Sequence, residues 1–183
     1  IALNLSERER LRVHRAAQPL RDEGLPVRWI DQDKLHITLK FLGDVRSEKL
    51  PEIEETMARV ADATQAFEME LGGFGAFPTI RRPRVIWLGV DASPELRCLK
   101  QDLEWGLGDC GFDPETRAFH PHITLGRAEE GGGAGAFRGL DDMVAEMDFQ
   151  RAVPVGSMDL MRSRLSRDGP RYEKLFAAKL ATA

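Results

Sequence analysis

The tetrapeptide His-Ile-Thr-Leu occurs twice, at residues 36–39 and 122–125. Composition alone predicts about 0.15 His-x-Thr pairs in this chain, so finding two of them calls for a cause other than chance. Two imidazoles with ordinary pKa values near 6.5 allow one ring to be neutral while the other is protonated. Concerted general base and general acid catalysis requires such a pair, which makes His36 and His122 the candidate catalytic residues.

The threonines of the two motifs extend this chemistry. Residues i and i+2 of a β-strand point to the same face, so His36 shares a face with Thr38, and His122 with Thr124. Two hydroxyls and an imidazolium hold a small tetrahedral anion, and a phosphodiester is the obvious candidate. No activated Ser or Cys nucleophile stands out, so water is the predicted attacking group.

Residues next to the motifs are weaker candidates. Lys40 shares the parity of His36 and is a candidate for substrate contact, whereas the parity of Phe41 favours the core. Strict alternation places Arg127 on the face of the strand opposite to that of His122, although Gly126 permits a bulge or the end of the strand. His120 is ambiguous, because the proline after it disrupts the alternation.

A metal site is the sharpest rival interpretation. Two histidines and an acid would bind zinc, and Asp44 or Asp159 would supply the carboxylate, but nothing in the sequence places these acids beside the histidines. The HExxH and CxxC spacings are absent, so we expect no metal and no cofactor. Cys98 and Cys110 form no metal pattern and no disulfide framework, which favours a reducing cytoplasm.

The elements that must position these residues alternate along the chain. Ser6 and Ser93 are predicted helix N-caps, residues 72–78 a turn or bulge, and 131–137 a mobile Gly-rich loop. Closely spaced strands favour a largely antiparallel sheet in an α+β fold. Strands are predicted at 1–5, 27–30, 35–42, 67–71, 84–90, 120–127, 155–165 and 172–180, and helices from Ser6 to about Gly24, from Ser47, from Ser93 and over 140–147.

Length and charge limit the alternatives. A chain of 183 residues suits one domain or two small lobes sharing a core. No apolar run approaches a membrane span, and no long exposed apolar stripe indicates an oligomer, so we expect a monomer without a membrane partner. A net charge of −4 argues against a protein that coats nucleic acid by bulk charge. Two arginine groups form either an RNA-backbone track or an ordinary soluble surface: Arg81, Arg82 and Arg84, and Arg162, Arg164 and Arg167.

Taken together, the motifs resemble those of the 2H phosphoesterase superfamily. Within it, the chain is similar to the RNA 2′,3′-cyclic phosphodiesterases, historically called 2′-5′ RNA ligases. The resemblance covers nearly the whole chain, including a closing strand–turn–strand pair. The matching stretches are IALNL (1–5), VRWIDQDKLHITLKFLGDV (27–45), GGFGAFP with RPRVIWLGV (72–90) and FHPHITLGR (119–127).

The resemblance implies a single bilobal α+β domain over residues 1–183, with two pseudo-symmetric lobes of largely antiparallel sheet flanking a central cleft. It also implies metal-independent hydrolysis of an RNA 2′,3′-cyclic phosphate, or of a nucleoside cyclic phosphate, to a 2′-phosphate, with reversible 2′-5′ ligation as a further activity. By similarity His36 is the general acid and His122 the general base. Arg127 helps to hold the phosphate, and Phe41 is where an aromatic lines the nucleobase pocket.

Two other functions stay open at this point. One is a 2H-type phosphodiesterase acting on another cyclic nucleotide, a cyclic sugar phosphate or a 2′-5′ linkage. The other is an RNA-binding module that retains the cleft without catalysis, against which the two intact His-x-Thr motifs argue. Replacing either histidine distinguishes them, because an acid–base pair loses orders of magnitude in turnover and a binding module does not.

Overall fold

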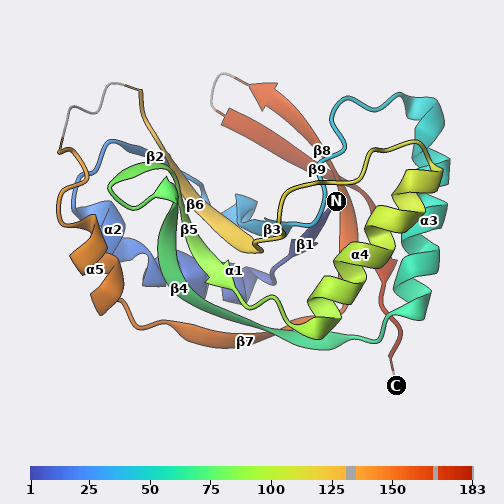
Figure 1. The fold of residues 1–183 in the computed structure, drawn as a ribbon, viewed down its shortest axis with the longest axis horizontal. Coiled ribbons are helices and arrows are strands. Elements are labelled where there is room, and N and C mark those ends of the chain that lie inside the picture. The colour runs from blue at the N-terminus through green and yellow to red at the C-terminus, as the bar shows by residue number, and fades with distance from the viewer. Residues whose placement is uncertain (131–134, 167–168, 183) are drawn as a thin grey trace.

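A computed structural model describes residues 1–130, 135–166 and 169–182 (Figure 1). Most of the predicted Gly-rich loop (131–134) and Arg167 lie outside this range. None of the described helices is both long and apolar enough to cross a membrane.

The strands form one curled antiparallel sheet, which confirms the α+β prediction (Figure 1). Every pairing between the named strands is antiparallel. The order is β7-β4-β5-β6-β3-β1-β8-β9, and β2 pairs with β6. The strands are β1 (Ala2–Asn4), β2 (Val27–Trp29), β3 (His36–Thr38), β4 (Phe67–Thr79), β5 (Arg82–Val90), β6 (His122–Ala128), β7 (Gln150–Val155), β8 (Ser157–Ser166) and β9 (Gly169–Lys179).

The helices form two groups, one of α1, α2 and α5 and the other of α3 and α4 (Figure 1). Glu9 of α1 contacts Arg151 of β7, and α3 and α4 pack against each other beside the β8–β9 end. Short 3-10 turns, η1 and η2, precede β3 and α3. The helical elements are α1 (Glu7–Ala16), α2 (Gln18–Asp22), η1 (Gln32–Lys34), η2 (Ser47–Lys49), α3 (Leu50–Ala63), α4 (Pro94–Asp109) and α5 (Leu140–Glu146).

The sheet consists of two arms that meet at one strand pair. The first arm is β3, β1, β8 and β9, and the second arm is β6, β5, β4 and β7. Each repeats one local unit: a strand, a helix capped by a serine, and a His-Ile-Thr strand antiparallel to the first strand. Both predicted caps are present, since Ser6 accepts from the Glu9 amide and Ser93 from the Leu96 amide, each at 3.3 Å.

The core lies on the face of the sheet opposite the histidines. Ile37 and Ile123 are completely buried there, together with Leu88 of β5 and the helix residues Val13 and Leu99. The burial of His36, Ile37 and Thr38 alternates as the sequence predicts. Packing of these central residues therefore fixes which face of β3 and β6 carries the polar side chains.

Two predicted boundaries are wrong, and a third segment is as predicted in one of its two alternatives. Residues 72–78, predicted as a turn or bulge, contain a bulge: β4 shifts its register at Gly73, which has a φ of 73°, and the strand then continues. β3 ends at Thr38, well before the predicted end of the strand at 42. The first predicted helix divides at Ala17, just before Pro19. The sequence patterns also do not predict β7.

Candidate active site

A single antiparallel residue pair sets the geometry of the candidate site. Ile37 of β3 pairs with Ile123 of β6. Continuing that register places His36 opposite Thr124 and Thr38 opposite His122, all on the face that Ile37 and Ile123 leave free. Each histidine thus lies beside the threonine of the other motif, and the two motifs confront each other across the middle of the sheet.

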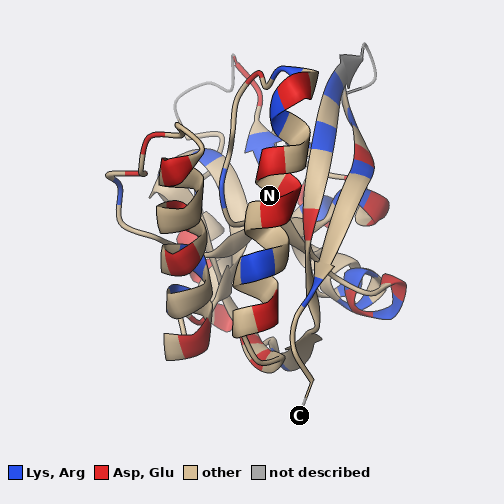
Figure 2. Ribbon diagram, turned by 90° about the vertical axis from the view of Figure 1, so that its right-hand side faces the viewer, with Lys and Arg blue, Asp and Glu red and all other residues tan. Residues whose placement is uncertain are grey.

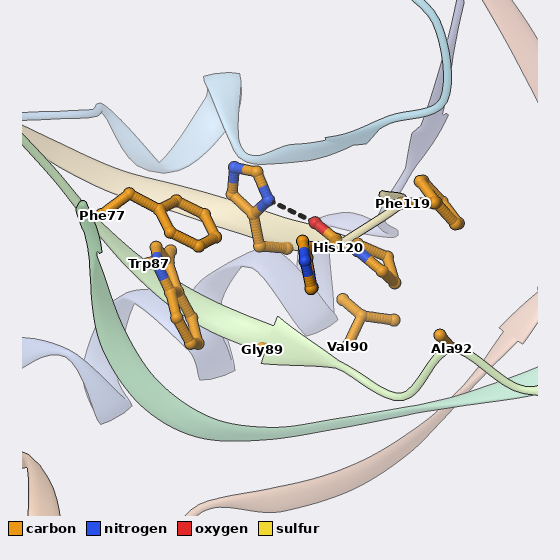
Figure 3. A pocket seen from close by; sticks show the side chains of 9 residues that line it. Phe77, Trp87, Gly89, Val90, Ala92, Phe119 and His120 are labelled. Atoms are coloured by element: carbon orange, nitrogen blue, oxygen red, sulfur yellow. Dashed lines mark hydrogen bonds between the residues drawn. The ribbon is translucent and has the colours of Figure 1, made fainter. Parts of the chain in front are cut away.

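Both histidines are held in the same way. Nδ1 of His36 lies 2.8 Å from the carbonyl oxygen of Lys34, and Nδ1 of His122 lies 2.7 Å from that of His120. Figure 3 shows the second of these bonds. A carbonyl oxygen only accepts, so each Nδ1 donates a hydrogen and each Nε2 is left to exchange a proton. Each ring can therefore act as an acid or a base through one defined atom.

An aromatic ring packs against each imidazole. Tyr172 of β9 meets His36 edge-on with ring centroids 5.1 Å apart, and Phe77 of β4 meets His122 in the same way at 5.2 Å. Burial lowers the pKa of His36 below its usual value, although the hydrogen bond to the Lys34 carbonyl opposes the shift, and the charge of His122 lowers it further. The neutral form of His36 is thus favoured more than in a free imidazole.

Arg127 lies on the face of His122 because of a bulge in β6. Trp87 pairs with Thr124, but Ile86 pairs with Gly126 and Val85 with Arg127, so one extra residue stands between Thr124 and Gly126. This resets the alternation that would have turned Arg127 away. A Cβ at Gly126 would lie 2.4 Å from a Val27 methyl carbon, so glycine permits the approach of β2 at this point.

Lys40 differs from its predicted role. Its ammonium is buried, bonded to Glu104, and donates to the carbonyl oxygen of Asp113 at 2.7 Å. Burial tends to raise the pKa of Glu104, but the hydrogen bonds from Lys100 and Lys40 lower it below its usual range. The alternation that points Lys40 toward substrate ends with β3 at Thr38, and its charge instead stabilises the junction with α4.

Phe41 lies on the surface and not in the core that its parity favours. Its side chain is 82% exposed, the highest exposure of the large hydrophobic residues that the structure describes. The cause is again the early end of β3, after which strand alternation no longer applies. An exposed aromatic five residues after His36 remains available for contact with a ligand.

The first arm also brings charged and polar groups to this face. Asn4 pairs with His36 across β1 and β3, and its side-chain amide donates to the Asp159 carboxylate at 2.6 Å. Lys174 contacts the same carboxylate at 2.9 Å. No local pattern in the sequence indicates this group, because its members come from three separate strands. Asp44 is not part of it.

The second arm carries an apolar pocket of about 220 Å³ beside His122 (Figure 3). Phe77 and Trp87 close one end, Phe119 lies toward the other, and the exposed imidazole of His120 stands between them. Neither Phe77 nor Trp87 is among the candidates from sequence. Trp87 was detectable, since in a strand over 84–90 it alternates with the buried Ile86 and Leu88. The full lining is Phe77, Trp87, Gly89, Val90, Ala92, Phe119, His120, Pro121 and His122.

The arginines predicted as an RNA track are dispersed. Arg162 pairs with Glu173, both across the strands and as an ion pair at 2.6 Å, while Tyr172 pairs with Ser163. Since Tyr172 faces His36, Arg162 points to the other side of the hairpin. Arg81 lies 3.9 Å from Asp141. In Figure 2 the basic bands of this hairpin contrast with the acidic helices α3 and α4.

No group of three or more His, Cys, Asp or Glu side chains is arranged to hold a metal ion within residues 1–130, 135–166 and 169–182. Cys98 is exposed and Cys110 is buried against Thr56, and neither forms a disulfide. The two motifs and the bulge that follows the second of them offer a ligand two imidazole Nε2 atoms, two hydroxyls and the Arg127 guanidinium.

Comparison with known proteins identifies relatives of nearly full length. The sequence profile of the 2′-5′ RNA ligase superfamily matches residues 9–166. The RNA 2′,3′-cyclic phosphodiesterase of Aeropyrum pernix is 37% identical over 94% of this chain and 97% of its own. The protein of the same name from Methanothermobacter thermautotrophicus is 34% identical over 98% of this chain and 97% of its own.

Solved structures agree with the sequence comparison. The protein TT0787 of Thermus thermophilus aligns with a TM-score of 0.77 and 27% identity, over 98% of this chain and 95% of its own. E. coli LigT, solved in complex with 3′-AMP, aligns with a TM-score of 0.72, 27% identity and the same coverage. The sheet and helices described above are thus those of an existing group of structures.

Proposed function

The chain belongs to the 2′-5′ RNA ligase superfamily, and we propose that it is an RNA 2′,3′-cyclic phosphodiesterase that opens the cyclic phosphate to a 2′-phosphate with His36 and His122 as its acid–base pair. One observation carries the proposal: both imidazoles face the same side of the sheet, each with Nδ1 bonded to a carbonyl and Nε2 left for the reaction. Because the pair combines one residue from each arm, we propose that residues 1–183 act as one catalytic unit.

In the proposed reaction, His122 is the general base. Its Nε2 takes a proton from water, and the water oxygen attacks phosphorus in line with the bond to the ribose 3′-oxygen. That bond breaks, and Nε2 of His36 donates a proton to the departing 3′-oxygen. The phosphate stays on the 2′-oxygen, so the product is a 2′-phosphate with a free 3′-hydroxyl. In the ligation direction a 5′-hydroxyl replaces water.

The groups between the histidines suit a phosphate anion. Thr38 and Thr124 each offer a hydroxyl donor beside the opposite histidine. Arg127 offers a planar pair of N–H donors from the same face of β6, which match phosphate oxygens. We propose that these three residues hold the phosphate oxygens that do not react, and that exposed Phe41 contacts the nucleobase of the cyclic end. This arrangement stabilises charge through hydrogen bonds and assigns no step to a metal.

A direct test is hydrolysis of a short RNA ending in a 2′,3′-cyclic phosphate, in excess EDTA, between about pH 5 and about pH 9. Exclusive formation of the 2′-phosphate is the expected result, with a bell-shaped dependence of kcat/KM on pH. Activity lost in EDTA and restored by added metal would overturn metal independence. No turnover under any condition would favour another cyclic phosphate substrate or a non-catalytic RNA-binding module.

A further inference from the structure

Apart from His122 itself, no side chain that lines the apolar pocket has a step in the hydrolysis described above. Eight of its nine lining residues belong to the second arm or to the chain leading into β6, the ninth, Ala92, follows β5, and none belongs to the strand of His36. Of the described residues, no Asp, Glu, Lys or Arg lines it. Such a pocket suits a flat, uncharged group whose position is fixed relative to the Nε2 atom of His122.

The in-line reaction determines which part of a substrate lies on that side. The departing 3′-oxygen and its ribose lie toward His36, because His36 supplies the proton to that oxygen. The attacking oxygen enters from the opposite side of phosphorus, toward His122. A group bound in the pocket is therefore attached to the attacking oxygen and not to the cyclic phosphate.

We propose that this pocket binds the base of a nucleoside whose 5′-hydroxyl attacks in place of water, which makes it the acceptor subsite for 2′-5′ phosphodiester formation. The inference rests on the proposed function and on its assignment of His122 as the base. The acceptor 5′-oxygen loses its proton to His122 and forms a bond to phosphorus. The bond from phosphorus to the 3′-oxygen breaks, and that oxygen takes a proton from His36. The product is a 2′-5′ phosphodiester with a free 3′-hydroxyl.

The pocket has the surfaces that a nucleobase requires. Phe77 and Trp87 lie with ring centroids 5.1 Å apart, and the imidazole of His120 lies 6.4 Å from Phe77 (Figure 3). Aromatic faces stack on every base, while the His120 imidazole supplies a hydrogen-bonding edge. The backbone carbonyl of His120 accepts the hydrogen bond that positions His122, the general base. The side chain of the same His120 lines the subsite.

Glycines make room for this subsite. A Cβ at Gly75 would lie 2.4 Å from the Trp87 indole, and a Cβ at Gly89 would lie 2.6 Å from the Gly72 carbonyl oxygen. The indole therefore lies on the bare backbone of β4, and the floor opposite His122 carries no side chain. The glycine-rich segment 72–75 thus permits a flat indole at this position.

A partition experiment tests the proposal. The enzyme is given a saturating dinucleotide with a 2′,3′-cyclic phosphate end and increasing adenosine as acceptor, and the 2′-phosphate and the 2′-5′-linked product are separated by chromatography. Both products arise from the same enzyme–donor complex, so their ratio does not depend on donor binding or on the folded fraction. Trp87→Leu, Phe77→Leu and His120→Ala are each expected to lower the ratio of linked to hydrolysed product, by about tenfold for the two rings.

Trp105→Leu is the matched control, because this tryptophan is 65% exposed on α4 and should leave the ratio unchanged. The proposal is overturned if the wild-type enzyme hydrolyses the donor but forms no linked product at any adenosine concentration. It is also overturned if the pocket variants raise KM for the cyclic phosphate while the product ratio stays constant, since the pocket would then hold the donor base. Absence of hydrolysis by the wild-type enzyme would instead contradict the proposed function.

A second measurement uses the reverse reaction. Cleavage of a 2′-5′-linked diadenosine to the cyclic phosphate and adenosine must pass through the same subsite. The pocket variants should reduce kcat/KM for this cleavage more than for hydrolysis of the cyclic phosphate. Equal losses on the two substrates would contradict the acceptor assignment.

Discussion

On the first arm, His36 lies beside Tyr172 and Asn4, whose amide bonds the carboxylate of the Asp159–Lys174 ion pair, whereas on the second arm His122 lies beside Phe77 and an apolar pocket. The backbone treats the two histidines alike, since each ring bonds the carbonyl two residues before it. The repeat therefore supplies two equivalent imidazoles, and only their surroundings distinguish the two sides of the site.

The positions just after the motifs show the same asymmetry. Phe41 and Arg127 each stand five residues after the histidine of their motif, and both are exposed. Phe41 follows the end of β3, while Arg127 stays in β6 and is turned to the face of His122 by the bulge. One arm thus offers a free aromatic ring where the other offers a cation. This difference gives the two sides of an asymmetric substrate two different binding groups.

The largest expected effect comes from removing either imidazole. His36→Ala and His122→Ala should each lower kcat by roughly 10²–10⁴. The two variants should lose opposite limbs of the pH profile, because an acid must be protonated and a base must not. His36→Ala should keep the limb that rises with pH, and His122→Ala the limb that falls. If both variants lose the same limb, the two arms do not have distinct roles.

A smaller loss is expected from Arg127→Ala. Removing a hydrogen bond to a charged phosphate should lower kcat/KM by roughly tenfold to a hundredfold, with Arg127→Lys retaining part of the activity. Arg97→Ala on the exposed side of α4 is the matched control and should leave kcat/KM unchanged. Equal effects of the two alanine variants would mean that Arg127 contributes only overall charge, and that the bulge has no part in binding.

The smallest effect concerns His36 of the first arm, and it is a shift in the midpoint of the pH dependence of kcat/KM. Because burial lowers the pKa of His36, the protonated acid is lost at a pH below 6.5, and kcat/KM should fall as pH rises through that midpoint. Tyr172→Ala admits water to the ring and should move the midpoint upward, toward 6.5. Rates measured from about pH 4.5 to about pH 8 test this, with Trp105→Ala as the control. A limb that rises through this midpoint would instead make His36 the base.

Much of the site's local geometry follows from the sequence. The two His-Ile-Thr-Leu motifs, the alternation of buried and polar residues within them, and the serine caps of the preceding helices are all local patterns. Strand alternation and helix capping involve residues only two to four positions apart. Both can therefore be recognised from the sequence alone. The α+β class follows for the same reason, since strand spacing excludes parallel crossovers.

Predictions fail where the local rule stops applying. Extending the alternation of β3 past Thr38 misplaces Lys40 and Phe41, because the strand has already ended. The glycines of 72–75 indicate a turn or bulge, and a bulge forms there, but no local pattern shows that Gly75 also leaves room for the Trp87 indole of the neighbouring strand. Neither the early end of β3 nor the packing of the Trp87 indole on β4 is indicated by a residue pattern within the segment itself.

The order of amino acids alone specifies the reactive groups and the face that each one shares with its neighbours. The folded chain adds that Ile37 pairs with Ile123, that a bulge returns Arg127 to the same face, and that Phe77, Trp87 and His120 enclose a pocket beside His122. These are contacts between segments far apart in the chain, and they depend on the packing of whole strands and helices. Local residue patterns have a range of a few residues, which is why they specify the chemistry but not the assembled site.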